Sequence, residues 1–217
     1  MKTKNKALNR RMFIGSMATV AAETLSLGLF PQSLYGYDEK VGKGLFVIGP
    51  IEGYTPQIGT LVSMLNYNRS TIVNAVKSLT QTQLDYLHDS SANTIGSLIL
   101  HLAAVEKYYQ VNTFEGREDF NEEENKMWSA ALNLGDEGRE VIKGHEIKYY
   151  LDILQEVRLN TLEQLKDKND GWLLAIDPIV SGQEEMNTYW KWFHVCEHES
   201  NHRGQIAWIK GRLPKNV

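Results

Sequence analysis

The sequence predicts an all-α protein, and two features of the chain indicate it. Apolar residues recur every three to four positions along four stretches between about residues 55 and 212, as they do on the buried side of a helix. The chain has only five prolines, and few runs alternate apolar and polar residues as strands do. Four amphipathic helices joined by linkers predict a four-helix bundle.

Length and composition fit one folded domain. The chain has 217 residues, of which 42% are hydrophobic and 23% charged, so it can bury a good core and is not of the disordered class. We divide it into a targeting segment at 1–36, an arm or loop at 37–54, and the helical domain at 55–217.

The first 36 residues have the character of an export signal. Lysines and arginines occupy the start, no acid precedes Glu23, and an apolar run extends from Met12 to Phe30. The stretch Asn9-Arg10-Arg11-Met12-Phe13-Ile14 resembles the twin-arginine signal. We therefore expect an exported, periplasmic or extracytoplasmic protein. An N-terminal membrane anchor is the alternative, but the run is short and contains Glu23, so no stable membrane span is expected after signal removal.

Charge excludes one class of partner. The first 36 residues carry five positive charges and one negative charge, so a chain without them has a net charge of −8, against −4 for the whole. An acidic domain without a basic patch binds nucleic acid poorly. The expected partner is a small-molecule substrate of unknown identity.

The first three predicted helices follow in order. Residues 41–54 form a glycine-rich loop, and Pro56 suits the first turn of a helix. The second helix begins after a cap at Asn93 or Thr94, and the third begins at about Glu146. Their apolar stripes are Ile58, Leu61, Leu65, Ile72, Val76 and Leu79; Ile95, Leu98, Leu102, Val105 and Tyr109; and Tyr150, Leu154, Val157, Leu162 and Leu165.

The last predicted helix, from Met186 to Lys210, carries two histidines on its apolar stripe. His198 and His202 are four residues apart, so they project to the same side of the helix. Burying two unpaired imidazoles costs free energy, and a shared metal ion would satisfy both. His101, at the edge of the second helix's apolar face, is the natural third ligand. Cys196, the only cysteine, lies on another side of the helix and is expected to pack rather than to bind metal.

The last helix also contains a short zinc-peptidase pattern. His198-Glu199-Ser200-Asn201-His202 fits H-E-x-x-H, in which Glu199 would activate a metal-bound water. The third ligand of such peptidases usually follows downstream, and no His, Asp or Glu follows His202. A zinc peptidase is therefore the less favoured hypothesis, and Glu199 is kept as a candidate general base.

Two segments resemble the DinB-like, or YfiT-like, family of metal-dependent hydrolases and transferases. Residues 94–106, TIGSLILHLAAVE, look like the family's second helix with its ligand histidine, and residues 198–206, HESNHRGQI, are similar to its closing H-x-x-x-H-R-G-Q-I. The resemblance implies an up-down-down-up four-helix bundle, a divalent metal held by His101, His198 and His202, and a homodimer. Zinc and nickel are the metals expected first.

The resemblance also implies a metal-dependent enzyme of the hydrolase or transferase type. His194 and Gln205 point towards the ligand side of the last helix, so we expect them to support the ligands from behind. The export signal argues against a cytosolic low-molecular-weight thiol as co-substrate. A bundle that binds metal without catalysis is the alternative function.

Overall fold

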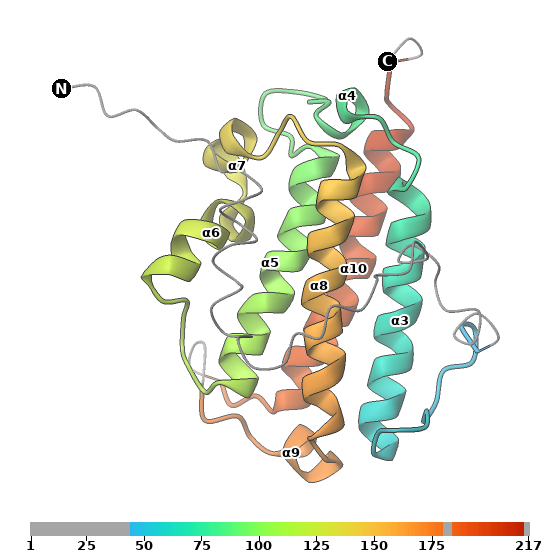
Figure 1. Ribbon diagram of the computed structural model, residues 1–217, viewed down its shortest axis with the longest axis vertical. Helices are drawn as coiled ribbons and strands as arrows, with labels where there is room; N and C mark the ends of the chain where they lie inside the picture. The colour runs from blue at the N-terminus through green and yellow to red at the C-terminus, as the bar shows by residue number, and fades with distance from the viewer. Residues whose placement is uncertain (1–43, 180–183, 215–217) are drawn as a thin grey trace, which may run out of the picture.

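The computed structural model describes residues 44–179 and 184–214, and this part of the chain is all-helical, which confirms the predicted fold class. The expected export signal at 1–36 lies outside the described residues. Four long helices lie side by side: α3 (Pro56–Val76), α5 (Ile95–Phe114), α8 (Ile147–Lys166) and α10 (Thr188–Lys210) (Figure 1). In this view α3 and α10 run upwards and α5 and α8 run downwards.

Short helices occupy the connections between the long ones. They are α4 (Gln81–Leu84), α6 (Glu122–Asn133), α7 (Gly135–Val141) and α9 (Asp170–Leu174). The starts of the long helices are set by local chemistry: Pro56 opens α3, the Thr94 hydroxyl accepts from the Ser97 N–H at α5, and the Asn187 side chain accepts from the Trp190 N–H at α10. None of the described helices is long and apolar enough to cross a membrane.

Helix α5 is the centre of the fold, because it packs against α8, α10 and α6. Every residue from Ile95 to Glu106 is buried, so the helix is covered on all sides rather than along one stripe. The approach to α8 is close: a Cβ added at Gly96 would lie 2.8 Å from the Tyr150 ring. Because α6 covers the outer side of α5, His101 is buried, although the sequence placed it at the edge of the core face.

Four charged side chains, one from each long helix, form a buried ion network. Arg69 of α3 and Arg158 of α8 bind Glu106 of α5 and Glu199 of α10, and none of the four is more than 4% exposed. Both arginines also donate to backbone carbonyls, of Leu154 and Leu65 respectively. The two positive and two negative charges balance. Because each long helix contributes one member, the ion pairs fix how the four helices sit against one another.

Removing one member of this network should destabilise the fold strongly. In Arg158→Met, two buried carboxylates share the remaining arginine, and loss of one partner of a buried ion pair costs about 3–5 kcal/mol. Urea denaturation followed by circular dichroism measures the effect. Lys126→Ala, which breaks an exposed pair on α6, is the control and should leave the unfolding midpoint nearly unchanged. Equal midpoints in the two variants would show that the network adds no stability.

Candidate metal centre

Three histidines converge between α5 and α10, as the sequence predicts. The Nε2 atom of His198 lies 3.0 Å from Nε2 of His101 and 2.6 Å from Nε2 of His202. His101 and His202 are buried, and His198 is partly exposed, so the cluster lies at the edge of the core. The three side chains are positioned to hold one metal ion.

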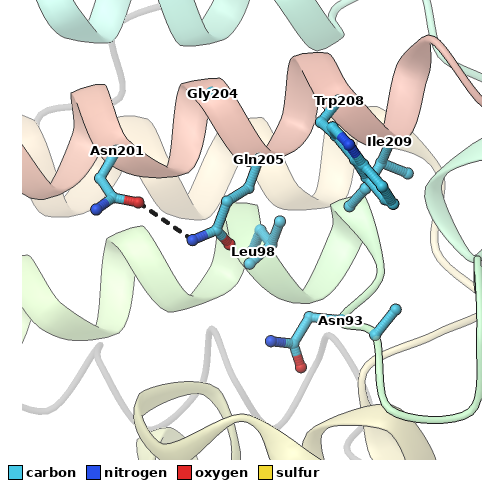
Figure 2. A pocket seen from close by; sticks show the side chains of 8 residues that line it. Asn93, Leu98, Asn201, Gly204, Gln205, Trp208 and Ile209 are labelled. Carbon is cyan, nitrogen blue, oxygen red and sulfur yellow. Dashed lines mark hydrogen bonds between the residues drawn. The ribbon is translucent and has the colours of Figure 1, made fainter.

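Hydrogen bonds behind the rings fix which nitrogen of His101 and His202 can bind metal. The Nδ1 of His101 lies 2.9 Å from the Ala131 carbonyl oxygen of α6, which can only accept, so Nδ1 carries the hydrogen and donates it. The Nδ1 of His202 lies 3.2 Å from Gln205 Oε1, and the Gln205 amide is oriented because its Nε2 donates to Asn201 (Figure 2). Both neutral rings therefore aim an Nε2 lone pair at the cluster.

The donor set fits a cation. A neutral His198 has at most one hydrogen on Nε2 and can direct it at only one of the other two rings, so at least one contact between nitrogens lacks a hydrogen bond. The Nδ1 of His198 is buried and has no hydrogen-bond partner among the described residues. Two imidazole nitrogens bound to one tetrahedral zinc lie about 3.3 Å apart, close to the spacing seen here.

The surroundings keep the three rings neutral. Burial lowers the pKa of all three, and the charge of neighbouring imidazoles lowers it further for His198 and His202, to about 3 and about 4 respectively. Neutral imidazole is the form that binds metal, so the site is ready to bind at neutral pH without first releasing protons.

Two residues expected behind the ligands have different environments. Gln205 supports a ligand directly, through the hydrogen bond with His202. His194 stacks on Trp190 with nearly parallel rings, pairs through Nδ1 with Glu197 at 2.8 Å, and meets the His198 ring edge-on with centroids 5.1 Å apart. His194 therefore packs against one ligand ring without a hydrogen bond to it among the described contacts.

Glu199 belongs to the buried ion network. Its Oε1 accepts from Arg69 at 2.6 Å and from Arg158 at 3.1 Å. Its Oε2 is buried and has no partner among the described residues. The candidate general base of the sequence pattern is therefore a core residue, and its charge is neutralised by two arginines. These contacts favour a structural role for Glu199 over that of a general base.

Sequence reasoning missed the residues that lie outside the histidine pattern. Arg69, Arg158 and Glu106 lie on three different helices, and no local spacing relates them to Glu199. The only feature of the sequence that could have indicated these three residues is their charge at positions next to the apolar stripes. Cys196 is buried, as expected of a packing residue: its sulfur accepts from Asn68 at 3.1 Å, and burial raises the pKa of the thiol to about 11.

Fold and site together define a helical protein in which three histidines from two helices are positioned to hold one metal ion, the arrangement that the resemblance to the DinB-like class implies. Comparison with protein-family models identifies the family more closely. Residues 60–213 match the mycothiol-S-transferase model, which belongs to this DinB-like class. The match covers well over half of the chain, so the chain belongs to the mycothiol-S-transferase family. A search of curated proteins finds no match.

Removing the support behind His202 should weaken metal binding without abolishing it. Gln205→Leu takes away the acceptor for the His202 N–H, and loss of such an outer partner typically lowers metal affinity about 10- to 100-fold. Competition with a chromophoric zinc chelator measures the affinity. The matched control is Gln164→Leu on exposed α8 surface, which should not change it. Equal affinities in both variants would show that Gln205 does not support the ligand.

The metal-free protein should lose stability as the pH falls. An unfolded histidine titrates near 6.5, whereas burial holds the folded pKa of His198 and His202 at about 3 and about 4. The contribution of these two histidines to the free energy of unfolding is therefore complete above pH 6.5, and it declines as the pH falls towards their pKa values in the folded protein. Urea denaturation of the metal-free protein between pH 8 and pH 4 tests this. His198→Ala should show a shallower decline, and an identical decline would contradict the prediction.

Proposed function

We propose that this protein is a metal-dependent transferase that activates the thiol of a small molecule at the three-histidine centre. The observation that carries the proposal is the convergence of three neutral imidazoles through Nε2. Three protein ligands leave a tetrahedral metal with an open position, which is the arrangement of catalytic rather than structural zinc sites. The family's name supports sulfur as the group transferred.

The bound metal would supply Lewis acidity, lowering the pKa of a coordinated thiol or water towards neutrality. The chain's own residues prepare that chemistry. The Ala131 carbonyl and Gln205 hold the rings of His101 and His202 with their lone pairs inward. Imidazole nitrogen suits both zinc and nickel, so either metal fits the three histidines, and zinc also has high affinity for thiolate sulfur.

Hydrolysis is the second reaction that the same centre supports, with water in place of the thiol. A zinc peptidase is less well supported, because Glu199 is paired with Arg69 and Arg158 and so lacks the freedom of a general base. A bundle that only binds metal would show the same ligand geometry, and turnover separates it from an enzyme.

Three features of the assembly are proposed on the resemblance and on residues 1–36. The four long helices form the up-down-down-up bundle of DinB-like proteins, in agreement with their directions in Figure 1. Two chains form a homodimer. The twin-arginine-like segment exports the folded, metal-loaded protein, in which case the thiol must be one present outside the cytoplasm.

The test is thiol transfer by the zinc-loaded protein. Mycothiol, glutathione and cysteine are each incubated with 1-chloro-2,4-dinitrobenzene, and thioether formation is followed by absorbance while metal content is measured by elemental analysis. We expect about one metal per chain and metal-dependent turnover with at least one thiol. His198→Ala and His202→Ala should lose both metal and turnover.

Glu197→Ala, which removes an exposed acid directly before His198, is the matched control and should retain both metal and turnover. If the protein holds about one metal per chain but neither transfers any of the thiols nor hydrolyses an ester, the bundle that binds metal without catalysis is the function that remains. No metal in the wild-type protein would overturn the site itself.

A further inference from the structure

A cavity of about 460 Å³ lies between the start of α5 and the last turns of α10 (Figure 2). Asn93 and Leu98 line it from the α5 side. Asn201, Gly204, Gln205 and Trp208 line it from α10. The volume is within the range of small-molecule sites.

The cavity is one helical turn away from the ligands on both helices. Leu98 precedes His101 by three residues on α5, and Gln205 follows His202 by three on α10, which corresponds to about 5 Å along each axis. Gln205 belongs to both places, since it lines the cavity and accepts from His202. A molecule bound at the metal therefore has room to extend into this space.

The chemistry of the lining selects a neutral group. None of the residues that line the cavity is charged, so the lining itself offers an ionised group no ion-pair partner. Three carboxamides, from Asn93, Asn201 and Gln205, offer both donors and acceptors. The Oδ1 of Asn93 is buried and has no hydrogen-bond partner among the described residues.

Trp208 supplies a flat apolar surface whose position is fixed. The Arg212 guanidinium lies 3.8 Å from the indole centroid, and the His88 ring meets the indole edge-on at 4.7 Å. The indole is about half exposed, so part of its surface is available to a ligand. A ring placed against it would gain contact area and a favourable aromatic geometry.

Gly204 keeps the cavity open. A Cβ added there would meet nothing within 4 Å, so the residue is not required by close packing. Glycine is also a poor helix former, and its place in the middle of α10 calls for another reason. The space that a side chain at 204 would occupy is part of this cavity.

We propose that this cavity binds an uncharged, ring-bearing group of the substrate through the three carboxamides and the Trp208 indole. The proposal rests on the proposed transferase function, because it treats the cavity as the place where the substrate's non-reacting portion is held. It deepens that function by naming the substrate class: a neutral molecule with a flat apolar face and hydrogen-bond donors and acceptors.

The test uses three probes that share one ring and differ in charge: benzamide, benzoate and benzylamine. Each is titrated into the full-length, zinc-loaded protein, and the indole N–H resonance of Trp208, assigned with Trp208→Phe, reports binding by NMR. We expect benzamide to shift this resonance and to bind at least about fivefold more tightly than either charged probe. Equal or tighter binding of a charged probe, or no shift at Trp208 with benzamide, would overturn the proposal.

Substitutions at Gly204 then locate the probe. Gly204→Leu fills the cavity and improves helix propensity, so we expect a folded protein that binds benzamide at least about tenfold more weakly, with Gly204→Ala intermediate. Ala207→Leu, an exposed α10 position outside the cavity, is the matched control and should change binding by less than about twofold. Unchanged affinity in both Gly204 variants would place the probe elsewhere and contradict the proposal.

Binding to His198→Ala separates this inference from the proposed function. Benzamide should bind this metal-free variant with the wild-type affinity, because no lining residue is changed. The cavity assignment would then stand even if the zinc-loaded protein transferred no thiol. Loss of benzamide binding in His198→Ala would instead show that the probe binds the metal, which would overturn the cavity assignment.

Discussion

The structure depends on one buried electrostatic constraint, the pairing of two arginines with two carboxylates at the meeting point of four helices. Charges in the core are tolerated only when each has its partners, so any shift that separates one pair leaves an uncompensated charge. The two carboxylates sit on the ligand helices: Glu106 follows His101 by five residues, and Glu199 follows His198 directly. A helix that slipped along its axis would break the ion network and separate the histidines together.

The ion network and the hydrogen bonds close to the ligands position the site in different ways. The network sets where α5 and α10 lie, and local hydrogen bonds then set how each imidazole is turned. Helix α6 belongs to a connecting segment, yet it helps to orient a ligand, because its Ala131 carbonyl fixes the His101 ring. Long-range ion pairs therefore determine the distance between ligands, and short-range backbone and amide contacts determine their orientation.

The helical class and the three ligands could be predicted from sequence because both rest on local periodicity. His198 and His202 are neighbours by helix geometry alone, and His101 follows from the resemblance and from its place near a core face. The burial of His101 could not be predicted, since it depends on α6 folding back over α5. The buried pairing of Glu199 could not be predicted for a similar reason: its partners Arg69 and Arg158 are 130 and 41 residues away in the chain, and residue spacing within one helix does not indicate contacts with other helices.

The state of the single cysteine has a consequence for the proposed thiol-transferase activity. A reactive surface cysteine would exchange with oxidised small thiols and become capped as a mixed disulfide. Cys196 is buried beside Asn68, and its raised pKa leaves almost no thiolate at neutral pH. Under the proposed function, the thiol that binds the metal is therefore the substrate's, and Cys196 would not consume that thiol by forming a mixed disulfide with it.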